Sequence, residues 1–200
     1  MNSPWLPVLA WWFGSAESPT EIAKAKNTLW FGKKASQDTD ARQRFGALVD
    51  QALQGELSDW AETPEGWLAL VLLLDQLPRM IFRNSPLAYA GDKRAQELVQ
   101  EGLTLERDLW LAPLQRTFIY LVLEHTEHLA AQDDAIQRFT ELLPSVPEAE
   151  RGYFKQTLDY AKKHRVVIER FGRFPHRNEV LERDSTEEEM AFLKGPGSRF

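Results

Sequence analysis

The densest apolar run of this 200-residue chain is Trp67-Leu68-Ala69-Leu70-Val71-Leu72-Leu73-Leu74, and it is followed by Asp75-Gln76-Leu77-Pro78-Arg79. This run is apolar all round, which is the pattern of a helix buried on every side. The run is too short to span a bilayer, which takes roughly 20 apolar residues. Pro78 lacks a backbone N–H and restricts the residue before it, so we expect the helix to end or bend there and to leave a carbonyl for another partner.

Capping residues mark helix boundaries on both sides of this stretch. Ser18-Pro19, Thr63-Pro64 and Ser85-Pro86 each place a hydroxyl cap before a proline suited to the first helical position. Ser18 with Glu21 and Ser185 with Glu188 match the capping box. Gly14 and Gly32 each follow an apolar Trp-Phe pair, and we expect each glycine to end the helix that contains the pair. We predict further helices over residues 38–54, 64–77, 86–102, 112–143 (with a break allowed near Asp133), 148–171 and 185–193, and no strand.

This pattern predicts an all-α protein that forms a single domain over residues 1–200. Hydrophobic residues make up 43% and charged residues 27%, a balance that allows a chain of this length to bury one core. About seven to nine helices with short connections would stack in pairs. A regular helical repeat and an irregular bundle both stay open, because the sequence has no strict period.

Composition excludes several classes of function. The chain has no cysteine, which rules out disulfides, a thiolate nucleophile and zinc sites that depend on sulfur. It lacks the nucleophile elbow, the phosphate loop and the dinucleotide fingerprint. No basic residue precedes the early apolar stretch from Trp5 to Phe13, as a secretory signal requires. The net charge of −6 argues against a nucleic-acid partner. Because the sequence shows neither a secretory signal nor a run that could span a bilayer, we expect a cytoplasmic protein with no membrane partner.

Asp75 and Arg79 form the first of three polar clusters that lie on or just beyond strongly apolar helices. A charge in such a place needs a partner to be tolerated. The two side chains are either a structural ion pair that fixes helix packing, which is the commoner case, or part of a functional site.

The second cluster spans residues 124–128, with the sequence Glu-His-Thr-Glu-His. Helical spacing places His125 in line with Leu114, Phe118 and Leu121, so we expect it to face the interior. The histidines are three apart, which fits neither zinc-protease pattern, and no glutamate precedes a histidine by three residues as di-iron bundles require. The sequence therefore predicts no metal site and favours a hydrogen-bonded core histidine.

The third cluster, residues 162–178, is a basic patch in an acidic protein. Between residues 162 and 177 the chain has six lysines and arginines against one acid, Glu169. His164 is in line with Ile168 and should face inward. Gly172 and Pro175 break the helix and place Arg173, His176 and Arg177 on a turn. These arginines either bind a carboxylate or phosphate or pair with acids such as Asp75 and Glu124.

The three clusters and several shorter motifs carry a resemblance over nearly the whole chain. The motif residues are Trp30-Phe31-Gly32, Leu72-Leu73-Leu74-Asp75-Gln76 with Pro78-Arg79, Glu124-His125 with Glu127, His164-Arg165, and Arg170-Phe171-Gly172-Arg173-Phe174-Pro175-His176-Arg177-Asn178. On these residues the sequence resembles a bacterial family catalogued only as a domain of unknown function, number nine-two-four. The resemblance implies a tetratricopeptide-like helical fold and supplies no activity, cofactor or catalytic residue. The chain departs from the family pattern at Met80 and Asn84, where asparagine and glycine are expected.

These observations favour a binding or scaffold protein with a polar groove for an anionic small molecule or a peptide carboxylate. The groove would be lined by Asp75, Arg79, Glu124, His125, His164, Arg165, Arg173, His176 and Arg177. No cofactor is predicted, and the oligomeric state stays open. One alternative is an enzyme in which Glu124 or Asp75 acts as general base and the histidines carry protons. Another is a structural protein that uses the same side chains to tie its helices together.

Overall fold

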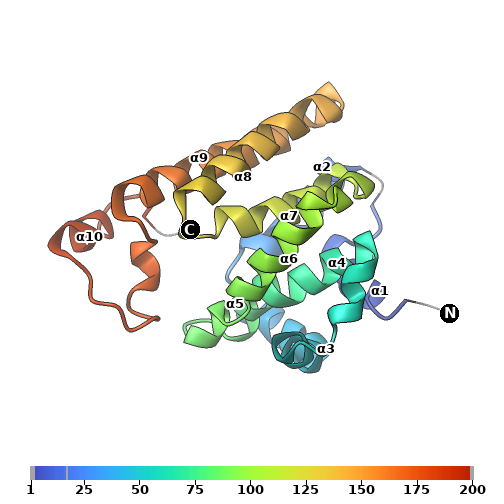
Figure 1. Ribbon diagram of the computed structural model, residues 1–200, viewed down its shortest axis with the longest axis horizontal. Helices are drawn as coiled ribbons and strands as arrows, with labels where there is room; N and C mark the ends of the chain where they lie inside the picture. Colours follow the sequence, from blue (N-terminus) through green and yellow to red (C-terminus); the bar gives the residue numbers. More distant parts are fainter. Residues whose placement is uncertain (1–2, 17, 199–200) are drawn as a thin grey trace.

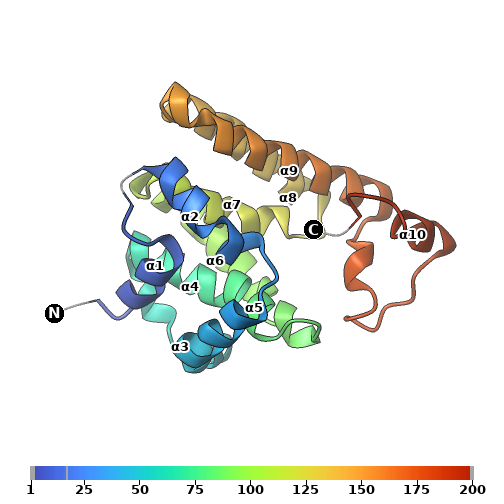
Figure 2. The same cartoon turned by 180° about the vertical axis from the view of Figure 1, so that it is seen from behind.

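The computed structural model describes residues 3–16 and 18–198, and over these residues it contains only helices, turns and connecting loops. The predicted all-α class is confirmed. Helices α1 to α7 make up the main body, α8 and α9 form a long pair along one side of it, and α10 lies at one end (Figure 1). Seen from behind, α1 and α2 lie on the near face of this body (Figure 2).

Several helices begin at the predicted caps. Ser18 and Thr63 each accept a hydrogen bond from the backbone N–H three residues further on. The cap of the last helix lies one residue later than expected, because Thr186 with Glu189, and not Ser185 with Glu188, forms the capping box. The α-helices are α1 (Leu6–Phe13), α2 (Pro19–Phe31), α3 (Ala35–Gln54), α4 (Pro64–Val71), α5 (Leu77–Ile81), α6 (Asp92–Thr104), α7 (Pro113–Glu124), α8 (Leu129–Leu142), α9 (Arg151–Phe171) and α10 (Glu187–Phe192).

The central helix does not end before Pro78. From α4 it passes into a π-helical turn, η2 (Leu72–Gln76), and continues as α5 to Ile81, beyond the predicted end at residue 77. A π turn changes the hydrogen-bond spacing, and such turns often occur at functional sites. Gly91 packs against this turn so closely that a Cβ would lie 2.2 Å from the carbonyl oxygen of Leu74. The backbone that positions Asp75 is therefore held by direct contact with the start of α6.

Two other predicted helices differ from the structure. The stretch 86–102 begins as a short 3-10 turn, η3 (Pro86–Tyr89), and α6 starts only at Asp92. The stretch 112–143 is two helices, and the break lies at residues 125–128 instead of near Asp133. Gln132 stabilises this break, because its Nε2 donates to the carbonyls of Glu124 at 2.6 Å and Thr126 at 2.8 Å, where helical partners are missing.

The core surrounds the central helix and extends to an aromatic group where α1 and α2 meet α7. The ring of Phe118 lies 5.4 Å from that of Trp12 and 4.9 Å from that of Trp30, measured between centroids. A smaller apolar cluster of Val167, Ile168 and Phe174 joins α9 to the turn that follows it. The turn after α9 thus packs against α9 through an apolar cluster that is separate from the main core.

The loop after α5 uses Asn84 in a conformation that favours glycine. Asn84 has a φ of 61°, in the left-handed region that asparagine tolerates better than most residues with a side chain. The asparagine that departs from the expected family pattern is therefore compatible with a glycine-type turn.

Candidate functional site

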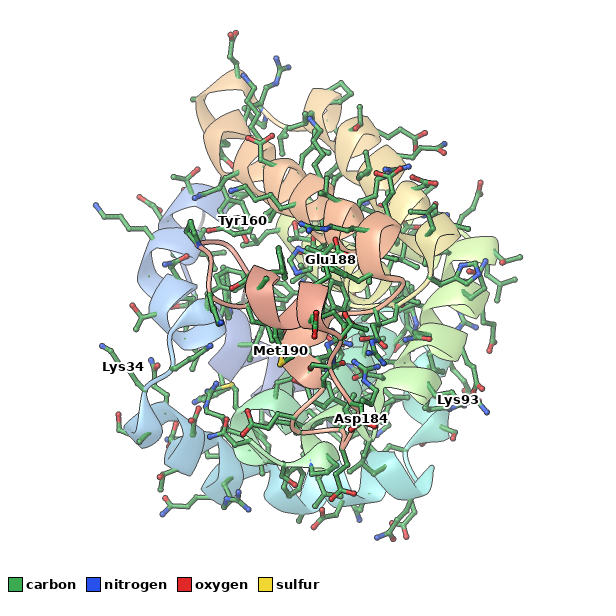
Figure 3. The ribbon with its side chains drawn as sticks, turned by 90° about the vertical axis from the view of Figure 1, so that its left-hand side faces the viewer. Lys34, Lys93, Tyr160, Asp184, Glu188 and Met190 are labelled. Atoms are coloured by element: carbon green, nitrogen blue, oxygen red, sulfur yellow. The ribbon has the colours of Figure 1, made fainter. Side chains whose placement is uncertain are left out.

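The three predicted clusters meet at one cavity of about 360 Å³. Its wall is formed by the end of α2, by α5 and the loop after it, by the end of α7, by α9 and by the turn after α9. The ionisable side chains on the wall, apart from Tyr89, are Lys33, Arg79, Arg83, His125, His164, His176, Arg177 and Glu179. Figure 3 views the molecule from the end at which the C-terminal segment, marked by Asp184, Glu188 and Met190, lies in front of the main body.

Asp75 is the buried centre behind this wall. Its carboxylate lies 3.1 Å from Nη1 of Arg79 and 2.9 Å from Nδ1 of His125, and Nε2 of Gln76 donates to it at 2.6 Å. Burial raises the pKa of Asp75, but the charges of Arg79 and His125 and the hydrogen bonds outweigh it and hold the pKa well below its usual range. Asp75 is therefore an ionised acceptor that orients Arg79 and His125.

Arg79 joins Asp75 to a second acid, Asp92 at the start of α6. Its Nη1 lies 2.9 Å from Oδ1 of Asp92, and the guanidinium also donates to the backbone carbonyl of Asp75. Burial lowers the pKa of Arg79, but the charges of Asp75 and Asp92 outweigh it and raise the pKa overall. Burial raises the pKa of Asp92, and the attraction of Arg79 does not offset burial together with repulsion from Asp75. The charge of Arg79 is thus compensated within the protein.

Arg177 is buried with much weaker compensation. Its guanidinium carbon lies 5.0 Å from the ring centroid of Tyr89 and 4.5 Å from that of Phe174, so the group is held between two aromatic rings. Its acidic partner Asp92 is 3.7 Å away, and its Nε has no hydrogen-bond partner among the described residues. Burial and repulsion from Arg79 lower the pKa of Arg177 to about 10. The cavity wall therefore carries a positive charge that an anion would stabilise.

His164 and Glu124 form a second pair of imidazole and carboxylate. Nδ1 of His164 lies 2.9 Å from Oε1 of Glu124 and 2.9 Å from the carbonyl oxygen of Tyr160. Because both partners are acceptors, Nδ1 carries the proton. The rings of His125 and His164 are 6.5 Å apart between centroids, and both border a second cavity of about 510 Å³. Glu124 lies on the wall of this second cavity.

Three predicted groove residues line neither cavity, which corrects the expectation: Asp75 is buried behind the wall, and Arg165 and Arg173 lie elsewhere. Arg165 pairs with Asp133 at 2.5 Å and Glu169 at 3.0 Å, and Arg173 pairs with Glu189 of α10 at 2.7 Å. Neither arginine is among the described residues that line the two cavities. The chain reverses at the left-handed Gly172 and again in the short 3-10 turn that follows, so neighbours in the basic segment have different partners.

Sequence reasoning missed several residues that build the site. Tyr89 and Asp92 fall in a stretch predicted as one regular helix, where nothing distinguishes them from surface positions. In the sequence Glu127 stands out only as part of a motif, yet it accepts the backbone N–H of Phe174 at 2.8 Å and hydrogen bonds from Arg183 at 2.6 and 3.0 Å. These bonds fix the turn that carries His176 and Arg177. All three missed residues lie in stretches predicted as helices, and the available signal for Glu127 is its place in the second polar cluster.

The part of the chain that the structure describes contains neither a metal-binding cluster of side chains nor a membrane-spanning helix. Over those residues, no three or more histidine, aspartate or glutamate side chains gather in a way that suits a metal ion. Within the same residues, no helix combines the length and apolar character needed to cross a bilayer.

Comparison with known protein families finds a match for the chain. Its sequence matches, over residues 8–197, the model of a family described as "Bacterial protein of unknown function (DUF924)". The chain belongs to this family. The DUF924 chain is also similar to the solved structure of a protein of unknown function, ATU0120, from Agrobacterium tumefaciens, with 34% identity and a TM-score of 0.79. That similarity covers 96% of this chain and 97% of the other. Comparison with curated proteins finds no match.

Proposed function

We propose that this DUF924 protein binds a small molecule with a carboxylate or phosphate group in the 360 Å³ cavity. The observation that supports this most strongly is the guanidinium of Arg177. It is held between Tyr89 and Phe174, and its acidic partner Asp92 is 3.7 Å away. A planar guanidinium binds carboxylate or phosphate through two parallel hydrogen bonds, and the flanking rings reduce the entropy lost when it does so.

The rest of the wall fits such a ligand. Arg79 supplies a second guanidinium, and the imidazoles of His125, His164 and His176 add further polar groups. The volume is within the range of roughly 300 to 1,000 Å³ that is typical of small-molecule sites. A peptide carboxylate offers the same chemistry on a larger partner. The tetratricopeptide-like repeat and the cytoplasmic location stay predictions beside this proposal.

Thermal melts with added anions test the proposal. Phosphate, sulfate or succinate should raise the melting temperature of the parent more than chloride does at equal ionic strength, because a ligand stabilises the state it binds. Arg177→Gln should lose this response, since a hydrogen bond to a charged group contributes about 1.5 to 3 kcal/mol. Without ligand, the variant should melt at the same temperature as the parent or higher, because a poorly compensated buried charge has been removed.

Arg170→Gln is the matched control, because Arg170 belongs to the same basic segment but pairs with Glu188 on the surface. It should keep the anion response. A parent that responds to these anions no more than to chloride, or an Arg177→Gln protein that responds as the parent does, would argue against the anion site.

A second candidate function is acid–base catalysis on the bound anion, and the Asp75–His125 pair favours it. Both carboxylate oxygens of Asp75 lie 2.9 Å from Nδ1 of His125, an arrangement that orients an imidazole for proton transfer at its other nitrogen. His125 also lies on the cavity wall.

Incubation with the anions that stabilise the protein, followed by proton NMR of the small molecule, separates binding from catalysis. Conversion by the parent and its loss in His125→Gln would support an enzyme. If the ligand binds but stays chemically unchanged, the result would support binding without catalysis.

A further inference from the structure

The second cavity, of about 510 Å³, lies between α2, the end of α7 and α9. Glu124 and Tyr153 line it together with His164, while Asn27, Gln156 and Tyr160 are exposed residues on its wall. It borders the anion cavity at His125 and His164, which line both.

Glu124 has one oxygen that the protein does not satisfy. The residue is 2% exposed, and its Oε1 is paired with Nδ1 of His164 at 2.9 Å. Its Oε2 is buried and has no hydrogen-bond partner among the described residues. A buried carboxylate oxygen normally accepts at least one hydrogen bond, because losing its hydration without compensation is costly.

Tyr153 has a second unsatisfied group on the same cavity. Its hydroxyl is buried and, within the described part of the chain, also has no hydrogen-bond partner. Burial and the nearby charge of Glu124 raise the pKa of Tyr153, so the phenol stays protonated and its oxygen can accept a hydrogen bond. Two residues that line one cavity therefore carry unsatisfied polar atoms: Oε2 of Glu124 lacks a donor, and the hydroxyl of Tyr153, which can both donate and accept, has no partner among the described residues.

We propose that this cavity binds a primary ammonium group, which donates hydrogen bonds to Oε2 of Glu124 and to the hydroxyl oxygen of Tyr153. An ammonium carries three donors and the positive charge that a buried carboxylate requires. Lys163 is a cation on the wall, and its Nζ lies 4.8 Å from the ring centroid of Tyr160. Lys163 is exposed, so solvent screens its charge. The ligand class is thus an amine, and this site does not depend on the anion site.

Ligand-observed NMR with three matched probes tests the assignment. Butylammonium should bind in the millimolar range or better. Butan-1-ol keeps the shape without the charge, and tetramethylammonium keeps the charge without N–H donors, so both should bind at least about tenfold more weakly. A single water in the cavity would satisfy Glu124 without creating this preference.

Variants locate the binding. Tyr153→Phe removes only the unsatisfied hydroxyl, so it should leave the melting temperature unchanged or raise it while weakening butylammonium binding several-fold. Glu124→Gln keeps the shape and should weaken binding about tenfold or more. If Glu124→Gln does not fold, Tyr153→Phe alone carries the test. Glu141→Gln, an exposed residue of α8, is the control and should bind as the parent does.

The inference would be overturned if the parent bound no butylammonium, if it bound butan-1-ol as tightly, or if both cavity variants bound the amine like the parent. Arg177→Gln should keep amine binding, so failure of this site and failure of the anion site give different results.

Discussion

Asp75 fixes two groups on the cavity wall at once. Its carboxylate contacts both Arg79 and His125 from a position that is 1% exposed. Such a buried acid is tolerated because two cationic or donor groups and Gln76 surround it. The same contacts set how stability depends on pH, because they favour the ionised form of Asp75 in the folded protein.

Acid should weaken the fold through Asp75. Its folded pKa lies below the unfolded value of about 3.9, so its contribution is present above that pH and is lost as the pH falls toward the folded pKa. Glu127 and Glu189, whose pKa values are also lowered, contribute in the same direction. The raised pKa of Asp92 acts oppositely, since its contribution is lost as the pH rises above about 4.

Urea unfolding between about pH 2 and pH 6 measures this dependence. At the upper end of this pH range, Asp75→Asn should lower the free energy of unfolding by about 3 kcal/mol, the lower end for a broken buried pair, because Asp92 still compensates Arg79. The free energy of unfolding of the variant should also fall less steeply than that of the parent as the pH is lowered. Parallel pH profiles for parent and variant would mean that Asp75 does not titrate in this way.

At the scale of helices, the break between α7 and α8 does most to build the site. Apolar periodicity predicted the buried face of α7, including Leu114 and Phe118, because that face follows from spacing alone. The position of the break did not follow from spacing. It depends on Gln132, which lies in a separate helix and bonds the carbonyls that end α7. Likewise, the π turn at Asp75 depends on contact with Gly91, which is distant in sequence.

Replacing Gln132 should therefore destabilise the junction. Gln132→Met keeps the volume but leaves buried carbonyls of Glu124 and Thr126 without their donor, which should cost about 1 to 3 kcal/mol. Gln137→Met, at an exposed position of the same helix where the side chain bonds Glu141, should change stability by less than about 0.5 kcal/mol. Chemical denaturation of both variants provides the comparison, and equal effects would contradict the role given to Gln132.

Over the whole molecule, Glu127 ties the C-terminal segment to the helical body. It lies in the α7–α8 turn and bonds both Phe174 and Arg183. The sequence singled out the polar clusters and the turn with Arg177, because charges beside apolar helices are conspicuous. It could not show which arginines share a cavity, since partners such as Glu127 and Glu189 come from distant segments.

Weakening the hydrogen bonds of Glu127 should reduce anion binding, although Glu127 does not itself contact the anion. Glu127→Gln weakens the charge-assisted bonds from Arg183 and should release the turn that holds Arg177. We expect the stabilisation by phosphate or succinate to fall at least several-fold, with the central core intact by circular dichroism. An unchanged anion response would show that the turn is held by its apolar contacts alone.

The most direct test of the anion site follows the arginine side chains themselves. In nitrogen–proton NMR spectra of the Nε–H groups, the signal of Arg177 is assigned by its absence from Arg177→Gln. Titration with succinate or phosphate should move the signals of Arg177 and Arg79 saturably and leave those of Arg165 and Arg173 in place, because these two are paired outside the cavity. Small shifts of equal size in all arginines, or saturable shifts confined to Arg165 and Arg173, would contradict the proposed site.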